Sequence, residues 1–241
     1  MPTVATSILQ NLGTVGAERA RRTEDPALAS AVLRVKAYQQ RRFGLTYADL
    51  LASARYRPAA QFFLDELYGP RDFTRRDAQF ERVVPALVHL FPTALVATVA
   101  VLAELHALSE QLDSALAARL DADAPLDAQA YAHAWQASAQ PAQRERQIAL
   151  TLQVGESLDR LTGNPLLHTS LRLMRGPAFA AGLGELQGFL EAGFESFRAM
   201  HGARDFLGLV DAREHHLNRA LFATPPGPAG PDLQALLPPP A

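Results

Sequence analysis

His106 and Glu110 have the residue types and the spacing best suited to proton transfer in this chain. They stand four residues apart in an apolar segment, so a helix would place them on one face, with Asp113 on the same side. A histidine beside a carboxylate can serve as a general acid or base near neutral pH. The alternative is structural, with His106 at the edge of a buried face and Glu110 stabilising it, and this interpretation is favoured. His106 and Glu110 are therefore candidate catalytic residues only in the enzyme hypothesis.

A second concentration of reactive side chains is the stretch FFLDELYGPRDFTRRD, residues 62–77. It holds three Phe, one Tyr, four acids and three arginines. Gly69 and Pro70 predict the end of one helix, and Thr74 predicts the start of the next. An ion-pair network that locks the two helices together accounts for most of the charge. The alternative is a ligand- or partner-binding surface, for which the candidate residues are Tyr68, Arg71, Asp72, Arg75 and Arg76.

Several other chemistries lack their residues. The chain has no cysteine, which excludes disulfides, thiolate metal sites and cysteine nucleophiles. It has no Glu-x-x-His for a di-iron site and no G-x-S-x-G for a serine nucleophile. Gly182, Gly184 and Gly188 depart from the spacing of a dinucleotide-binding loop. Asp211 and His215 would need further ligands to hold a metal, and no metal site is predicted.

The elements that would position these residues are all predicted to be helices. Apolar residues recur every three or four positions, and Pro, Gly, Asp and Asn mark the helix ends. Examples are Asp25-Pro26, an N-cap followed by proline at the first helical position, and Gln140-Pro141 and Asn164-Pro165, each of which precedes a further helical segment. No segment alternates apolar and polar residues as a half-buried strand does. The sequence predicts an all-α fold, a single domain of about eight to ten helices over residues 24–222.

The two ends of the chain are expected to lie outside that domain. Residues 1–23 are predicted to be a flexible N-terminal segment. Residues 223–241 hold seven of the seventeen prolines and are predicted to be a disordered tail.

The overall charge argues against two classes of partner. The net charge of −2 and the pI near 6.4 provide no general attraction to nucleic acid or to an anionic membrane. The longest apolar run, Thr93–Ala103, is too short to span a bilayer, and no positive charge precedes the first apolar segment as in a signal peptide. We expect a cytoplasmic protein that binds neither nucleic acid nor membrane. The abundance of Ala and Arg indicates a GC-rich bacterial genome.

The stretch 62–77 also has a resemblance. Together with LAELHALSEQLD, RERQIALTLQVG and LLHTSLRLMRGPAFAAGLGELQGFLEAGFESFRAM, it resembles a family of uncharacterised, mainly proteobacterial, all-helical proteins. The resemblance covers about residues 28–222. It implies no activity, cofactor or partner, and no functional residue is transferred from it.

A weaker resemblance concerns the fold. The order of FFLDELYG, an acidic turn and a long apolar helix ending in LSEQLDSALAARL is similar to part of a globin-like domain. A globin would bind haem through a histidine near the end of that helix. This chain has no histidine between His106 and His133. Haem is thus only an alternative, and no cofactor is predicted.

These observations lead to three functional hypotheses. The first is a non-catalytic ligand-sensing or protein-interaction domain, an adaptor or regulator that could form a homodimer. The second is a pocket protein that holds haem or another small apolar ligand between its helices. The third and least favoured is an enzyme that uses His106 and Glu110 for proton transfer. The protein partner of the first hypothesis is not identified by the sequence.

Overall fold

The computed structural model describes residues 3–66, 73–90, 93–122, 124–223 and 231–239. Within these ranges the chain is all-α and contains no strand, which confirms the predicted fold class. The helices are α1 (Val4–Glu24), α2 (Pro26–Thr46), α3 (Ala48–Ala52), α4 (Arg57–Glu66), α5 (Thr74–Leu90), α6 (Thr93–Ala117), α7 (Ala128–Ala137), α8 (Pro141–Thr162), α9 (Pro165–Leu173), α10 (Arg175–Ala180), α11 (Gly184–Ala199), α12 (Arg204–Ala223) and α13 (Pro231–Leu236). They outnumber the eight to ten expected, because both end segments contain a helix and several helices are short.

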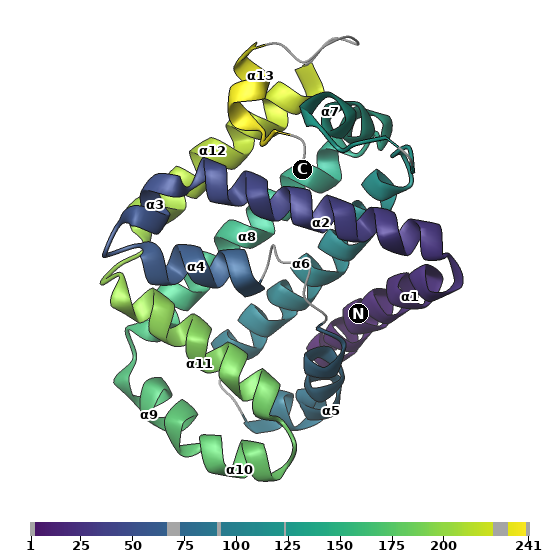
Figure 1. Cartoon of the computed structure of the whole chain (residues 1–241). Coiled ribbons are helices and arrows are strands. Elements are labelled where there is room, and N and C mark those ends of the chain that lie inside the picture. The colour runs from purple at the N-terminus through teal and green to yellow at the C-terminus, as the bar shows by residue number, and fades with distance from the viewer. Residues whose placement is uncertain (1–2, 67–72, 91–92, 123, 224–230, 240–241) are drawn as a thin grey trace.

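Helix α6 runs through the middle of the molecule (Figure 1). It packs against α1, α2 and α8 and buries apolar side chains such as Val99, Leu105 and Leu112. By length and composition alone, α6 is apolar enough to cross a membrane. The core helix of a globular protein passes the same test, and the three helices around α6 give it that environment here.

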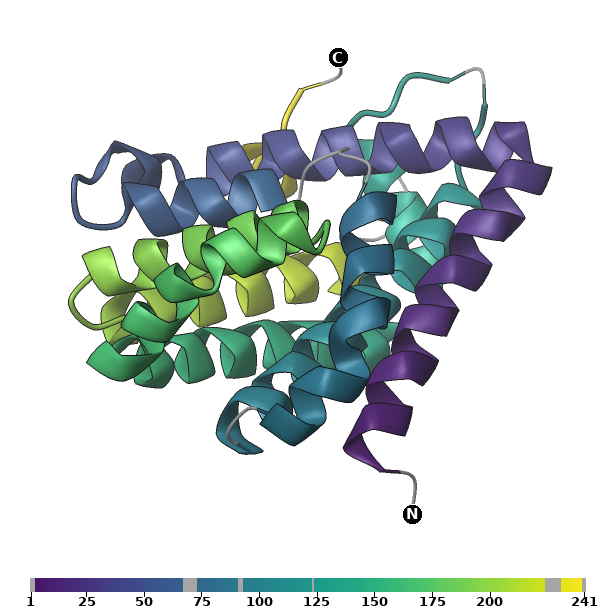
Figure 2. The ribbon, with the colours of Figure 1, turned by 90° about the horizontal axis from the view of Figure 1, so that it is seen from below.

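The N-terminal segment differs from the flexible chain expected for residues 1–23, because Val4–Glu24 is a helix. The Thr3 side chain caps it by accepting a hydrogen bond from the backbone N–H of Thr6 at 3.2 Å. Ile8 and Leu12, one turn apart, are buried against side chains of α5 and α6. Figure 2 shows α1 lying alongside α5 at the edge of the molecule. The burial of this apolar stripe against α5 and α6 stabilises α1.

Helix α2 crosses in front of α6 and α8 in Figure 1. Its start was predicted correctly. The Asp25 side chain accepts a hydrogen bond from the backbone N–H of Leu28 at 3.0 Å, and Pro26 occupies the first position of the helix. Tyr38 of α2 stacks on Tyr131 of α7, with ring centroids 4.7 Å apart. This pair lies in a core shared by α2, α7 and α12.

The C-terminal segment also differs from the disordered tail expected for residues 223–241. Pro231–Leu236 forms α13, and Leu233 and Leu237 are buried in the same core as Tyr38. The Tyr38 hydroxyl donates a hydrogen bond to the Pro238 carbonyl at 3.1 Å. The prolines indicated a disordered segment, but the buried leucines decide the structure of residues 231–237.

The other end of the domain is built on aromatic side chains. Phe63 of α4 packs on Phe197 of α11 and on Phe206 of α12, with centroids 6.1 and 5.7 Å away.

Helices α9 and α10 lie outside α11, at the lower edge of Figure 1. The Asn164 side chain caps α9 through the backbone N–H of Leu166, as the Asn164-Pro165 pair predicts.

Candidate functional site

The residues predicted from the stretch 62–77 only partly fall within the described structure. Tyr68, Arg71 and Asp72 lie outside the described residues. Arg75 is exposed and forms an ion pair with Glu185 of α11, with 3.3 Å between Nε and Oε1. Arg76 is largely buried, and its guanidinium lies over the rings of Phe73 and Phe189, 3.9 and 4.5 Å from their centroids.

Arg76 connects parts of the chain that meet at α5. It forms ion pairs with Glu66 of α4, 3.2 Å away, and with the neighbouring Asp77 at 3.6 Å. Burial lowers the pKa of Arg76, and the charges of Asp77 and Glu66 partly offset that effect. The ion pair with Glu66 joins α4 to α5, the two helices of the expected ion-pair network, and the contact with the Phe189 ring adds α11.

His106 pairs with Asp77 of α5 rather than with Glu110. Its Nε2 lies 2.8 Å from Asp77 Oδ2, and Arg19 of α1 binds the same oxygen at 2.6 Å. Burial alone would raise the pKa of Asp77. The hydrogen bond to His106 and the charges of His106, Arg76 and Arg19 outweigh it, so the pKa is lowered. A His–Asp pair can hold a base in position, but neither residue lines either of the two cavities described below.

Glu110 is held by two cations from other helices. Arg22 of α1 binds one carboxylate oxygen, and Lys36 of α2 binds the other at 2.6 Å. Burial would raise the pKa of Glu110, but Lys36 and Arg22 outweigh this effect and lower it to about 2. Arg22 also donates to the Ser114 hydroxyl at 2.7 Å. The i,i+4 pairing of His106 with Glu110 was therefore wrong, because tertiary partners engage both side chains.

Asp113 lies one turn further along α6 and is buried beside this cluster. Gln39 of α2 donates a hydrogen bond to its carboxyl group at 3.1 Å. Burial raises the pKa of Asp113, and the charge of Glu110 adds to that rise, whereas Lys36 and Arg144 oppose it. Asp113 thus lies beside Glu110 and contacts Gln39, one of the polar side chains that α2, α7, α8 and α12 contribute to a cavity.

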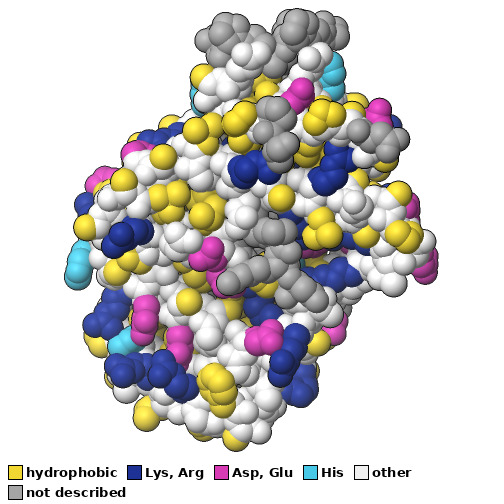
Figure 3. Space-filling view, viewed as in Figure 1, with side chains coloured by type: hydrophobic (Ala, Val, Ile, Leu, Met, Phe, Trp, Pro, Cys, Tyr) yellow, Lys and Arg dark blue, Asp and Glu magenta, His cyan; other side chains and the backbone are white. Residues whose placement is uncertain are grey.

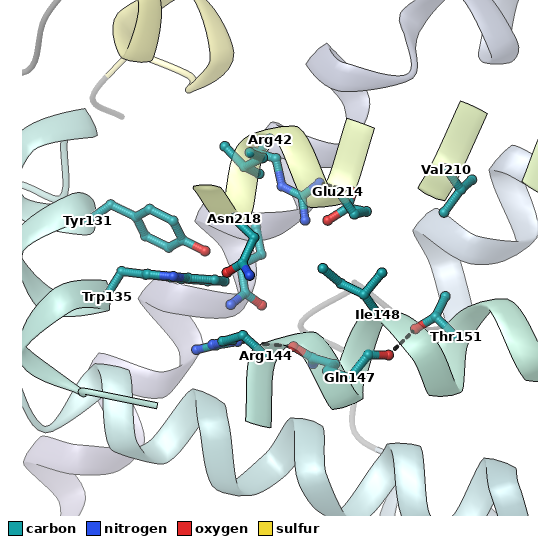
Figure 4. A pocket seen from close by; sticks show the side chains of 12 residues that line it. Arg42, Tyr131, Trp135, Arg144, Gln147, Ile148, Thr151, Val210, Glu214 and Asn218 are labelled. Carbon is teal, nitrogen blue, oxygen red and sulfur yellow. Dashed lines mark hydrogen bonds and ion pairs between the residues drawn. The ribbon is translucent and has the colours of Figure 1, made fainter. Parts of the chain in front are cut away.

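Those side chains surround a small cavity between α2, α7, α8 and α12, with a volume of about 40 Å³ (Figure 4). Arg42 of α2 forms an ion pair with Glu214 of α12 at its upper side. Arg144 of α8 lies over the face of Trp135, 3.8 Å from the ring centroid, and donates to the Gln147 side chain at 3.2 Å. Asn218 of α12 lies between these groups.

The cavity wall includes buried polar atoms of Trp135 and Asn218 that have no hydrogen-bond partner within the described chain. They are Nε1 of Trp135 and Oδ1 of Asn218. An unsatisfied buried donor or acceptor costs about 1–3 kcal/mol. This cavity could not be predicted from the sequence, because its wall combines side chains of four helices and no local motif links them.

A wider groove lies between α1, α6 and α8, with a volume of about 430 Å³. Amide side chains line it, among them Asn11, Gln111 and Gln143. Arg146 and Glu104 form an ion pair on its wall, with 2.7 Å between Nη2 and Oε1. Among the described residues, no group of three or more His, Asp and Glu side chains could hold a metal ion.

The surface of α9 and α10 exposes large apolar side chains. We name Leu166, Leu173, Met174 and Phe179 the α9–α10 surface; they are 76%, 72%, 46% and 61% exposed. Helix α9 has no buried residue, although Leu166 and Leu173 lie seven positions apart on one face. Hydrophobic and basic side chains lie next to each other over these helices in Figure 3.

Charged side chains surround the α9–α10 surface. Arg175 binds the Glu191 carboxylate at 2.6 Å, and Arg198 approaches the ring nitrogen of His168 at 3.0 Å. Arg172 is exposed at the end of α9. This surface was not predicted from the sequence, although the pattern PLLHTSLRL of α9 is amphipathic. The pattern predicts which face of α9 is apolar, but it does not predict that the described helices leave this face exposed.

The comparisons place the chain in a family without an assigned role. The chain belongs to the family described as "Domain of unknown function (DUF8198)", which matches residues 18–228. This match begins within α1 and includes all helices from α2 to α12. No curated protein and no solved structure matches the chain.

Proposed function

We propose that this domain is a non-catalytic protein-interaction domain whose docking site is the α9–α10 surface. The partner is a protein segment with apolar anchors flanked by acidic residues. One observation carries the proposal. Among the large hydrophobic side chains of the described chain, the three most exposed are Leu166, Leu173 and Phe179, all within fourteen residues of one another.

Exposing these hydrophobic side chains to water costs free energy, and the fold does not need them to be exposed. Single exposed hydrophobic residues are ordinary, but large apolar groups gathered on adjacent helices favour association with another surface. Leu166 and Leu173 project from the same face of α9, and Phe179 follows on α10. Two leucines seven residues apart and a nearby aromatic ring offer apolar contacts to an amphipathic partner segment.

The charges beside the apolar groups favour an acidic partner. Arg172, Arg175, Arg198 and His168 lie on α9, α10 and α11, whereas the acidic side chains near Arg175 are Glu191 and Glu195. In a two-fold dimer formed through this face, the same basic side chains of both copies would come together. Charge complementarity therefore favours a different, acidic chain over a second copy.

The buried charges support a non-catalytic role. Glu110 and Asp77 are bound by cations from other helices, and Arg76 lies between aromatic rings. These pairs fix helices to one another. Side chains engaged in this way stabilise the frame that carries the α9–α10 surface.

A photo-crosslinking experiment in cells that naturally express the protein tests the proposal. A photoreactive phenylalanine analogue replaces Phe179, and in a matched control it replaces Leu33 of α2, which is 55% exposed. We expect a cross-linked partner at position 179 that position 33 does not give. Mass spectrometry then maps the partner segment, which is synthesised as a peptide.

Binding of that peptide to the purified chain decides the outcome. We expect saturable binding that weakens as salt is added, because salt screens the arginines. Leu173→Ser should weaken binding about tenfold or more, whereas Leu33→Ser should not. A basic segment, a cross-link to another copy of the chain, or equal effects of the two substitutions would contradict the proposal.

A further inference from the structure

The cavity between α2, α7, α8 and α12 has features of a binding site that is distinct from the α9–α10 surface. Its lining includes Gln39, Tyr131, Trp135, Arg144, Glu214 and Asn218. Figure 4 shows Tyr131 and Trp135 on one side, Arg42 and Glu214 above, and Arg144 and Gln147 below. Every one of these side chains comes from a helix that also packs in the core, so the arrangement is fixed before any ligand arrives.

The unpartnered polar atoms of Trp135 and Asn218 indicate what a ligand must offer. Trp135 is 8% exposed and its Nε1–H can only donate, whereas Asn218 is 4% exposed and its Oδ1 can only accept. The other end of the Asn218 amide is already used, because its Nδ2 donates to Glu145. This contact fixes which way the amide points. A ligand that satisfies both atoms must therefore carry an acceptor and a donor.

The wall contains guanidinium groups, which bind anions. Two arginines, Arg42 and Arg144, line the cavity together with one carboxylate, Glu214. Both guanidinium groups stay protonated at all physiological pH values. Glu214 is engaged by Arg42 and also accepts a hydrogen bond from the Tyr47 hydroxyl at 2.7 Å. Behind this wall, Asp113 binds Gln39 and Glu145 binds Asn218, so these carboxyl groups contact lining amides.

The volume limits the size of the ligand. A cavity of about 40 Å³ has room for about three water molecules, if each needs about 10–15 Å³. This excludes nucleotides, sugars and haem, and it leaves molecules of about four non-hydrogen atoms. A planar group suits the site best, because a guanidinium recognises two oxygens in one plane.

We infer that this cavity binds a small planar oxyanion that keeps one proton, the chemistry of hydrogencarbonate. Its oxygens accept hydrogen bonds from the Trp135 indole N–H and from Arg144. Its O–H donates to Asn218 Oδ1. Such a ligand joins α7, α8 and α12, so it stabilises the folded chain as it binds.

Calorimetric titration of the purified full chain with sodium hydrogencarbonate tests this inference. The titration is done in a sealed cell at mildly alkaline pH and constant ionic strength, and thermal unfolding is followed under the same conditions. Nitrate and urea serve as comparison ligands. Nitrate has the same shape and charge without a proton, and urea has the same shape with donors but no charge.

We expect hydrogencarbonate to bind saturably and to raise the melting temperature. Nitrate should bind about fivefold more weakly, because it cannot donate to Asn218, and urea should not bind. Equal binding of nitrate would contradict the role given to Asn218, and tighter binding of urea would contradict an anion site. No saturable binding of any of the three would mean that the cavity holds only water, and the inference would fail.

Two substitutions connect the binding to the cavity. Trp135→Phe removes the N–H but keeps an aromatic ring under Arg144, and we expect it to weaken hydrogencarbonate binding about fivefold. Thr151→Val is the matched control. Thr151 also lines the cavity, but its hydroxyl already donates to the Gln147 carbonyl at 2.9 Å. A Trp135→Phe chain that is folded and binds as tightly as Thr151→Val would overturn the assignment.

Discussion

Glu110 joins three helices through one carboxylate. Its two oxygens are bound by Arg22 of α1 and Lys36 of α2, whereas the residue itself belongs to α6. Removing one member of such a buried ion-pair group leaves the remaining charges without a counter-charge and largely shielded from water. The residue is 4% exposed, so little solvent screens these ion pairs. Glu110 therefore matters for stability, in a position where the sequence alone also allowed a catalytic role.

Glu110→Gln should destabilise the protein by about 3 kcal/mol or more, because Arg22 and Lys36 lose their shared counter-charge. The measurement is the free energy of unfolding in urea. Glu104→Gln, also on α6, provides the control. Its partner Arg146 is half exposed, and such a surface pair contributes about 0–1 kcal/mol. Equal losses in the two variants would contradict this account of Glu110.

The same carboxylate should make stability depend on pH. The folded-state pKa of Glu110, about 2, lies below the ordinary value of 4.5. A carboxylate with a lowered pKa contributes its full stability above the unfolded-state pKa and loses it as pH falls through the folded-state pKa. We expect the unfolding free energy to fall between about pH 5 and pH 2. The fall should be smaller in Glu110→Gln, and an unchanged slope would show that other groups cause it.

At the scale of the helix, substitutions in α1 show whether this end segment is part of the cooperatively folded domain. Ile8 is fully buried, whereas the next residue, Leu9, is 39% exposed. Ile8→Ala should cost about 2–5 kcal/mol of unfolding free energy, because it leaves a cavity against α5 and α6. Leu9→Ala should change it by about 0.5 kcal/mol or less. If both substitutions proved neutral, α1 would not be part of the cooperative fold.

Helices α8 and α12 approach each other closely at Gly155. A Cβ atom placed there would lie 2.4 Å from Leu207 Cδ2, so Gly155→Ala must displace the Leu207 side chain. We expect a loss of about 1–3 kcal/mol, reduced by the better helix propensity of alanine. Gly208→Ala is the matched control, since nothing lies within 4 Å of the new atom and this exposed site should gain stability. Urea unfolding of both variants checks the opposite signs.

Much of the element structure could be predicted because its causes are local. Asp25-Pro26, Gln140-Pro141 and Asn164-Pro165 each stand at the start of a helix, as expected. Capping is set by residues within one turn of each other, so the sequence is sufficient. The packing of α1 and α13 was not predictable in this way. Their leucines and isoleucines are buried largely against helices that are remote in sequence, α5 and α6 for α1 and α2 for α13.

The candidate sites depend on contacts of still longer range. Arg22 and Glu110 are separated by 88 residues, and Arg42 and Glu214 by 172. A sequence suggests partners one turn away, as it did for His106 and Glu110, but a long arginine can reach any helix that packs beside it. The charge of these side chains and their approximate burial were predictable from the sequence, but the residue with which each one pairs was not.

At the scale of the whole molecule, we expect the side chains of the α9–α10 surface to contribute little to folding and much to association. Leu166→Ser and Leu173→Ser together should change the unfolding free energy by only about 0.5 kcal/mol, because both side chains remain mostly in water. The double variant should nevertheless bind less of a fluorescent hydrophobic dye and elute earlier in hydrophobic-interaction chromatography. Leu33→Ser, at a single exposed position on α2, should change neither property to the same extent. A large loss of stability would instead place these leucines in the core, and it would contradict the proposal that the α9–α10 surface is a docking site.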